Sequence, residues 1–295
     1  MQLLKTPGWD DYELLDSGNG QRLERFGSYV ISKPDPQTIW KPSLNEAEWD
    51  KADARYLEKD PARNALHSDA GGWIKNNLPE KWPLTYSNIK FYAKLTPFKH
   101  TGVFPEQILN WEYMQDKIQK AGKQVNVLNL FGYTGIASLV CAANGAKVTH
   151  LDGSKPAITW ARENQTLSGL LDKPIRWILD DAVEFTARES RRGNTYDAII
   201  MDPPVYGHGP NGEIWDFNKS FPELLKNCQK ILSQNPIFVI VNAYAISSSS
   251  QMLANTMQDY LKFEQNKIEY GELCLQEKNR NRLLSTGIFA RYSSI

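Results

Sequence analysis

From about residue 105 onward, apolar segments of strand length alternate with segments of helical length, and this alternation constrains the fold more than any other feature of the chain. The apolar segments are hydrophobic throughout, which is typical of parallel strands in a sheet that helices cover on both faces. The sequence therefore predicts a doubly wound α/β domain. The expected parallel strands are residues 125–131, 146–152, 175–179, 197–202 and 236–244.

Helix signals fill the intervals between these strands. Pro105 suits the first turn of a helix, and Gly122 ends that helix. After the last helix, two strand-like segments, 267–276 and 282–292, are joined by the turn-forming sequence 277–282. With no helix between them these two strands must be antiparallel, because a parallel pair requires a crossover connection. Seven strands are thus expected, with helices over residues 105–121, 134–144, 156–169, 182–191, 222–232 and 250–261.

The first part of the chain has a different texture. Nine of the 16 prolines lie at or before Pro105, and five of the nine tryptophans precede residue 98. Short β-like segments, 12–17, 21–32 and 88–95, stand between turn signals. The sequence therefore predicts a small β-rich N-terminal domain over residues 1–98 and an α/β domain over residues 99–295.

Composition narrows the classes of protein to which the chain can belong. The 34 basic and 34 acidic side chains cancel, so any contact with nucleic acid must come from a local patch. No apolar run approaches the roughly 20 residues that cross a bilayer, and the first residues lack the apolar region of a signal peptide. We therefore expect a cytoplasmic protein without membrane contact. The cysteines at 141, 228 and 274 have no metal-ligand spacing and are predicted to be buried thiols.

In a doubly wound sheet the ligand lies beyond the carboxyl ends of the strands, so the residues after each strand matter most. The first strand is followed by LNLFGYTG, residues 128–135, in which Gly132 and Gly135 allow the backbone to approach a ligand. Asn129 adds a short polar side chain at the end of the strand. The G-x-G-x-x-G spacing of a dinucleotide site is absent, and a plain turn between strand and helix remains an alternative.

Carboxylates follow the next two strands. Asp152 is placed to accept hydrogen bonds from a ribose diol. The alternative is that Asp152 caps the following helix, although Ser154 can make that cap instead. After the third strand comes Asp180-Asp181-Ala182, where one carboxylate is expected to cap a helix and the other to accept the exocyclic amine of an adenine.

The fourth strand ends on IIMDPPVYGHG, residues 199–209. Its two prolines remove backbone donors and fix the turn, so the Asp202 carboxylate and the Pro203 carbonyl remain as acceptors for an NH2 group. Tyr206 offers a face on which a planar ring can stack, and His208 is placed to act as a general base. The glycine-rich stretch 207–212 is expected to close over substrate. A rigid surface turn is the alternative.

As a set, these residues resemble the class I S-adenosylmethionine-dependent methyltransferases. The glycine turn is similar to their cofactor loop, Asp152 to their ribose ligand, Asp181 to their adenine contact, and the DPP sequence to their fourth-strand motif. The resemblance implies a seven-stranded Rossmann-like sheet with an antiparallel carboxyl-terminal strand and S-adenosylmethionine as cofactor. It also implies direct in-line transfer of the methyl group, with catalysis mostly by positioning.

A narrower resemblance is to the ribosomal RNA large-subunit methyltransferases of the I and K type. Their VLNLF-x-YTG loop matches residues 127–135, and their TG-x-F-x-DQ segment matches TGVFPEQ at 101–107, with Glu106 in place of Asp. Val205 replaces a lysine that often follows DPP in those proteins. The resemblance implies the following cofactor contacts: Phe104, Gln107, Asn129, Phe131, Gly132, Tyr133, Thr134, Gly135, Asp152, Ser154, Asp181, Ala182 and Asp202.

The function expected from these residues is methylation of a nitrogen of an RNA base, with ribosomal RNA as the first candidate. Cytosine-C5 transfer is disfavoured, because the relatives that perform it carry a cysteine after the fifth strand, where this chain reads Asn242-Ala243-Tyr244. A methyltransferase acting on a small molecule or a protein, and a non-catalytic nucleoside-binding module, remain alternatives. The oligomeric state is not set by the sequence. No metal is expected, because no ligand spacing links His67, His100, His150 and His208.

Overall fold

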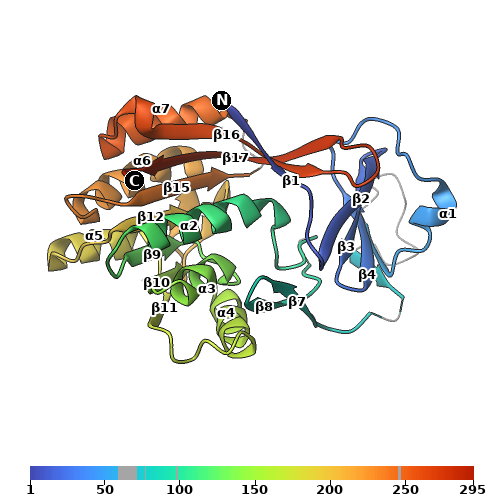
Figure 1. The fold of residues 1–295 in the computed structure, drawn as a ribbon, viewed down its shortest axis with the longest axis horizontal. Coiled ribbons are helices and arrows are strands. Elements are labelled where there is room, and N and C mark those ends of the chain that lie inside the picture. The colour runs from blue at the N-terminus through green and yellow to red at the C-terminus, as the bar shows by residue number, and fades with distance from the viewer. Residues whose placement is uncertain (59–71, 77, 98, 245–246) are drawn as a thin grey trace. The chain divides into compact units, whose positions relative to one another are not determined.

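The computed structural model describes residues 1–58, 72–76, 78–97, 99–244 and 247–295. These residues form two compact units, and each unit is made of more than one stretch of the chain (Figure 1). The large unit comprises residues 1–4, 107–273 and 286–295, and the small unit comprises residues 5–106 and 274–285. The units are thus discontinuous, whereas the sequence suggested one division at residue 98.

The large unit is built on an eight-stranded sheet with the order β1-β16-β17-β15-β12-β9-β10-β11. Neighbouring strands from β15 to β11 are parallel, and β17 is antiparallel to β15. The predicted Rossmann-like class and all seven predicted strands are confirmed. The strands are β1 (Gln2–Thr6), β9 (Asn126–Leu130), β10 (Lys147–Asp152), β11 (Ile175–Leu179), β12 (Ala198–Met201), β15 (Phe238–Ala243), β16 (Ile268–Gln276) and β17 (Leu283–Ser293).

The eighth strand, β1, lies beside β16 at the edge of the sheet and was not expected from the sequence. Its sequence QLLKT buries only Thr6, so it lacks the alternating pattern that marks a strand.

Six helices of the large unit connect the strands, after a 3₁₀ turn at Pro105–Gln107. The helix expected to start at Pro222 starts at Phe217 instead. The reason is a cap: the Asp216 side chain accepts a hydrogen bond from Asn218 N at 3.1 Å, and Pro222 lies inside the helix. The helices are α2 (Ile108–Lys120), α3 (Ile136–Ala143), α4 (Lys155–Leu167), α5 (Ala182–Arg192), α6 (Phe217–Ile231) and α7 (Ser250–Leu261).

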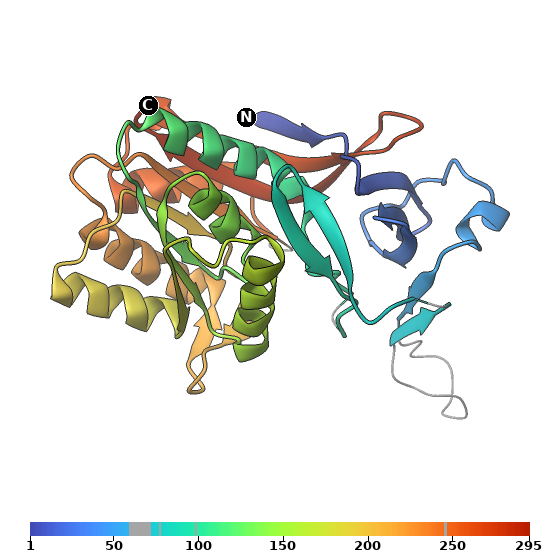
Figure 2. The ribbon, with the colours of Figure 1, turned by 60° about the horizontal axis from the view of Figure 1, so that its bottom comes forward.

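Helices cover both faces of the sheet, with α2, α3 and α4 on one face and α5, α6 and α7 on the other (Figures 1 and 2). Because side chains alternate along a strand, Leu128 and Leu130 of β9 join the apolar core with Phe185 and Phe221. Asn129, between the two leucines, points to the opposite face. None of the helices in the described part of the chain is both long and apolar enough to cross a membrane.

The small unit is β-rich, as predicted. It holds a five-stranded sheet with the order β2-β3-β4-β5-β6 and a separate hairpin of β7 and β8. Residues 21–32, expected as one β segment, form two strands that turn at Gly27-Ser28, because Gly27 takes a positive φ of 63°. The elements are β2 (Tyr12–Gly18), β3 (Gln21–Phe26), β4 (Tyr29–Pro34), α1 (Glu46–Trp49), β5 (Ala54–Leu57), β6 (Gly72–Lys75), β7 (Trp82–Tyr86) and β8 (Ile89–Ala93).

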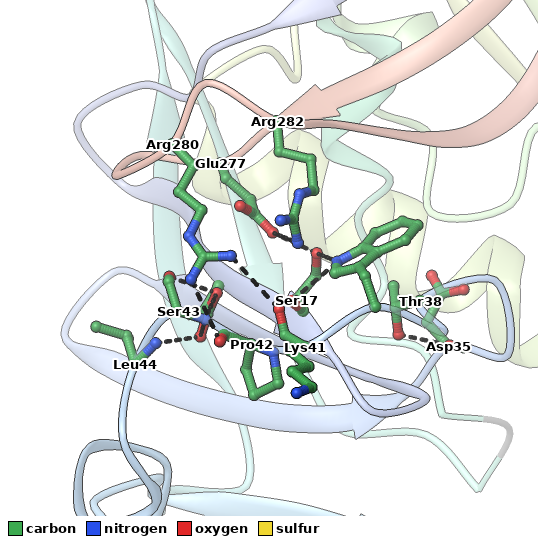
Figure 3. Close-up of polar contacts among 12 residues, drawn as sticks. Ser17, Asp35, Thr38, Lys41, Pro42, Ser43, Leu44, Glu277, Arg280 and Arg282 are labelled. Carbon is green, nitrogen blue, oxygen red and sulfur yellow. Dashed lines mark hydrogen bonds and ion pairs between the residues drawn. The ribbon is translucent and has the colours of Figure 1, made fainter.

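The turn between β16 and β17 belongs to the small unit and is fixed there by polar contacts (Figure 3). Arg280 donates hydrogen bonds to the carbonyl oxygens of Lys41 and Pro42, at 3.4 and 3.3 Å. Glu277 is buried and accepts a hydrogen bond from the Ser17 hydroxyl. These contacts give the late hairpin a structural role in holding the small unit together.

Candidate cofactor and substrate site

The loop between β9 and α3 turns sharply at the carboxyl edge of the sheet. The φ angles of Phe131, Tyr133 and Gly135 are 55°, 50° and 81°, so the backbone repeatedly enters the left-handed region. This conformation costs about 1–3 kcal/mol for each non-glycine residue and must be held by its surroundings. Gly132 N donates to the Leu151 carbonyl oxygen at 3.0 Å, which fastens the loop to β10. Backbone of this kind turns within a few residues, so the main chain itself can lie close to a ligand.

Three buried polar side chains, those of Asn129, Ser138 and His150, pack beneath this loop. A Cβ added at Gly132 would lie 2.4 Å from Cε1 of His150, so only glycine fits here. Asn129 Nδ2 donates to Ser138 Oγ at 2.9 Å, and Ser138 Oγ lies 3.0 Å from His150 Nδ1. Burial lowers the pKa of His150 to about 3, so its ring is neutral. Asn129 therefore helps to hold the loop in place, and its predicted contact with the cofactor stays a prediction.

Asp152 lies at the end of β10, next to the glycine loop. Its Oδ2 accepts a hydrogen bond from Tyr133 N, and its Oδ1 accepts one from Ser154 N, both at 2.8 Å. Burial raises the pKa of Asp152, and the two amides oppose that effect. Ser154 caps α4, with its Oγ accepting from Ala157 N at 3.4 Å. Because Ser154 makes the cap, Asp152 keeps further acceptor positions for the hydroxyls of a ribose.

The two carboxylates after β11 have separate roles. Asp181 caps α5, since its Oδ1 accepts from Val183 N and Glu184 N, each at 2.9 Å. Asp180 pairs with Arg188. Asp181 is the residue predicted to contact adenine, and both of its capping bonds use the same oxygen. The adjoining Ala182 is buried at the start of the helix.

The DPP turn leads into a hairpin that the sequence did not predict. After β12, Asp202 is half-buried and Pro203 is buried. Gly207 and His208, the first two residues of the stretch expected to close over substrate, lie in β13 (Tyr206–His208), which is paired antiparallel with β14 (Ile214–Asp216). Residues 209–213 form the turn between the two strands. The two strands were not predicted because each is only three residues long and because the glycines and the proline at residues 207–212 are typical of a loop.

The hairpin presents two different faces. Tyr206 is 57% exposed, and its ring lies perpendicular to that of His208 with 5.3 Å between the centroids. Trp215, on the other face, is buried. Its Nε1 donates to the Pro204 carbonyl oxygen at 2.6 Å, and its ring lies 4.8 Å from that of Phe131 in the glycine loop. The predicted substrate residues Tyr206 and His208 thus lie side by side, with Trp215 behind them.

A second polar network joins the start of α2 to the end of β15. Gln107 Nε2 donates to the Tyr244 hydroxyl at 2.6 Å, and Gln107 Oε1 accepts from Asn110 Nδ2 at 2.9 Å. Asn110 also donates to Asn242 Oδ1 at 3.0 Å. The sequence pointed to Gln107 but missed Asn110 and Tyr244. The spacing of Gln107 and Asn110, one helical turn apart, was the available signal.

The remaining predicted residues divide between the two units. Thr134 is buried in the glycine loop, where its carbonyl oxygen accepts from Asn164. Phe104 lies in the small unit, with its ring 5.3 Å from that of His100. His67 lies outside the described residues. Among the residues that are described, no group of three or more His, Cys, Asp and Glu side chains is placed to hold a metal ion.

The three cysteines are buried, as predicted. Cys141 lies in α3, Cys228 in α6 and Cys274 in β16. Burial raises the pKa of the Cys141 and Cys228 thiols well above the ordinary value, which suppresses thiolate nucleophiles.

Comparison with known proteins decides the family. The family model described as S-adenosylmethionine-dependent methyltransferase matches residues 42–261. The chain belongs to this family. A crystal structure of the SAM-dependent methyltransferase from Agrobacterium tumefaciens is 40% identical, with a TM-score of 0.91 over 100% of this chain and 94% of that chain. A Streptococcus mutans methyltransferase has a TM-score of 0.68 at 19% identity, over 96% of this chain and 75% of that chain, and shows the fold alone.

Curated relatives resemble the methyltransferase over a shorter span. The protein named ribosomal RNA large subunit methyltransferase K/L from Shewanella frigidimarina is 36% identical over 155 residues. The alignment covers 52% of this chain and 21% of the relative, so about a fifth of that longer protein is matched.

The residues at the strand ends fit the family's cofactor, S-adenosylmethionine. The tight left-handed backbone of residues 131–135 lets the main chain lie close to a ligand. The Asp152 and Asp181 carboxylates follow adjacent strands and supply acceptors for a ribose and for an exocyclic amine.

Proposed function

We propose that this methyltransferase transfers a methyl group to a nitrogen of a base in RNA, with ribosomal RNA as the substrate class. One observation carries the proposal: the Asp202-Pro203 turn continues directly into the exposed face formed by Tyr206 and His208. A base nitrogen needs acceptors for its hydrogens and a surface for its ring, and this segment supplies both.

The cofactor is proposed to lie across the ends of β9, β10 and β11. In this arrangement Asp152 accepts hydrogen bonds from the ribose, and Asp181 accepts one from the adenine amine. The glycine loop, residues 131–135, approaches the cofactor through its backbone, and Gln107 contributes from the start of α2. The contact proposed for Phe104 rests on the TGVFPEQ motif alone.

The substrate amine is proposed to be held by Asp202 and by the Pro203 carbonyl. Neither proline of the turn carries a backbone N–H, so residues 203 and 204 contribute acceptors and no backbone donor. Trp215 donates to the Pro204 carbonyl, which leaves Pro203 as the proline carbonyl assigned to the substrate. Two acceptors orient the amine so that its lone pair points away from them. Tyr206 packs on the base and fixes its plane.

The chemistry requires little more than this positioning. The bound cofactor supplies a sulfonium, which is an already activated methyl donor. Holding an amine in line with it accounts for most of the rate enhancement that a transferase of this kind needs. His208, exposed next to Tyr206, is proposed to take the proton that the amine loses.

Two observations bear on the substrate class and on the methylated atom. The curated relatives are named as ribosomal RNA methyltransferases, although only about a fifth of their length is matched. The described part of the chain has no cysteine at the end of β15, where Asn242-Ala243-Tyr244 stands, which argues against cytosine-C5 transfer. Action on ribosomal RNA places the protein in the cytoplasm.

The test is methyl transfer from tritiated S-adenosylmethionine to ribosomal RNA isolated from cells that lack the enzyme, followed by mass spectrometry of the nucleosides. We expect labelled RNA and one N-methylated nucleoside. Asp202→Asn and Tyr206→Ala should lower the rate by about 100-fold or more, whereas the exposed Glu223→Gln in α6 serves as the matched carboxylate control. Label found only in protein or small molecules, or a C-methylated base, would overturn the proposal.

A further inference from the structure

The β13–β14 hairpin crosses the carboxyl edge of the sheet over the loops that follow β9 and β10. It starts after β12, and β9 and then β10 follow β12 in the order of the sheet. Trp215 of β14 packs against Phe131 in the loop after β9. At the hairpin tip, a Cβ added to Gly153 after β10 would lie 3.4 Å from the His208 carbonyl oxygen and 3.8 Å from Pro210 Cδ. The hairpin therefore touches two of the proposed cofactor loops.

Trp215 is the residue that joins these loops to the DPP turn. It is 3% exposed and lies opposite Gly207 in the hairpin register. Its ring contacts the glycine loop, and its Nε1–H holds the Pro204 carbonyl at 2.6 Å. One rigid side chain thus contacts both the cofactor loop and the turn proposed to hold the substrate amine.

The pairing of β13 with β14 connects Trp215 to the face of the hairpin that holds Tyr206 and His208. Tyr206 pairs with Asp216, and His208 pairs with Ile214, so these four side chains share the face away from Trp215. A shift of Trp215 would move Tyr206 and His208 with it, because the strand pairs bind the two faces together. A shift of the loop at Phe131 or Gly153 would act on the same hairpin from below.

We propose that Trp215 is a positioning residue that couples occupancy of the cofactor site to the orientation of Tyr206 and His208. The coupling itself requires only that the protein binds the cofactor of its family. The role of the coupling in methyl transfer rests on the proposed function. When the cofactor orders the loops at Phe131 and Gly153, the hairpin is held by both, and the DPP turn is fixed through the Pro204 carbonyl. A bound substrate amine then meets a preformed set of acceptors.

Hydrogen exchange tests the coupling without any substrate. Amide exchange over residues 204–216 is measured in the full chain with and without saturating S-adenosylhomocysteine. We expect about tenfold slower exchange in the presence of the ligand for the parent protein. The protection should be lost in Trp215→Ala and in Gly153→Val, which puts a branched side chain against the hairpin tip. Ile214→Ala, on the opposite face of the same hairpin, should keep the protection.

The conservative variant Trp215→Phe separates positioning from simple packing. It keeps an aromatic ring against Phe131, although a smaller one, and removes the Nε1–H that donates to the Pro204 carbonyl. We expect the variant to stay folded and its dissociation constant for S-adenosylhomocysteine to stay within about twofold of that of the parent. Its kcat for RNA methylation should fall about tenfold. Trp215→Ala should lose both ligand affinity and kcat.

Each outcome bears on the proposal. Unchanged exchange over residues 204–216 on ligand binding in the parent would overturn it, as would protection that survives in folded Trp215→Ala. A kcat in Trp215→Phe equal to that of the parent would show that the hydrogen bond does not position the turn. If exchange is coupled to the ligand but RNA is not methylated, the coupling stands and the proposed substrate fails.

Discussion

Gln107 Nε2 lies 2.6 Å from the hydroxyl oxygen of Tyr244, so a hydrogen bond fastens the start of α2 to the end of β15. The network continues from Gln107 to Asn110 and Asn242, both of which are buried. Gln107 is therefore held in one orientation from two sides. A side chain fixed in this way is suited to contact a ligand without further loss of conformational freedom.

Tyr244→Phe removes the acceptor of the Gln107 amide while keeping the ring. We expect a loss of about 1 kcal/mol in the free energy of unfolding and a several-fold loss in affinity for S-adenosylhomocysteine. Urea titration and calorimetric titration measure the two effects. Tyr270→Phe is the matched control, because no hydrogen bond is seen for the Tyr270 hydroxyl within the described residues. Equal losses in both variants would contradict a specific role for Tyr244.

Asp152→Ala should weaken S-adenosylhomocysteine binding by about 10- to 100-fold, because it removes the half-buried carboxylate that is proposed to accept the ribose hydroxyls. Calorimetric titration gives the dissociation constants. The thermal midpoint measures the same loss, since saturating ligand no longer stabilises the variant. Asp172→Ala changes an exposed aspartate after α4 and should bind normally. Parent-like affinity in Asp152→Ala would remove this residue from the site.

Gly132→Ala should destabilise the protein by about 1–3 kcal/mol and abolish measurable cofactor binding, because the added Cβ overlaps the His150 ring in the buried group under the loop. Chemical denaturation and calorimetric titration provide the two readouts. Gly207→Ala is a comparison for stability, since its Cβ would meet Pro204 at an ordinary 3.5 Å. A parent-like stability for Gly132→Ala would mean that the loop and His150 separate at little cost.

The stability of the large unit should fall as the pH drops below about 6.5 through protonation linked to His150. Burial lowers the pKa of His150 to about 3 in the folded protein, so the unfolded chain binds a proton between about pH 6.5 and pH 3 that the folded chain does not. Stability from this group is complete above the unfolded pKa and is lost toward the folded one. The expected slope is about 1.4 kcal/mol per pH unit for one proton.

His150→Gln removes this titration, so its stability should change less steeply than that of the parent between pH 7.5 and pH 5. Thermal midpoints across that range check the difference. Identical slopes in the parent and in His150→Gln would show that the ring is already charged in the folded state.

The sheet could be predicted from the sequence because its inner strands are apolar throughout, as in Ala198-Ile199-Ile200-Met201. The same reasoning placed Asp152 and Asp202 correctly at the carboxyl ends of their strands. This reasoning did not predict the short strands that contain few apolar residues. QLLKT at β1 and the three-residue strands β13 and β14 are stabilised by their neighbours in the fold, and local sequence does not record those neighbours.

The roles of polar side chains were harder to predict than their positions. Asn129 lies near the end of β9, as predicted, and its amide donates to Ser138 because strand alternation places it on the face that α3 covers. Trp215 carried no motif, and its importance follows only from contacts with Phe131 and Pro204 that lie far away in sequence. Long-range contacts of this kind require the fold to be known first.

The edge position of β1 has a consequence for synthesis of the chain on the ribosome. Gln2–Thr6 is made long before its partner β16, which begins only at Ile268. The small unit likewise lacks residues 274–285 until the ribosome has made the whole of residues 107–273. Both units therefore stay incomplete while the intervening residues are made, and nascent molecules expose β1 as an unpaired strand during that time.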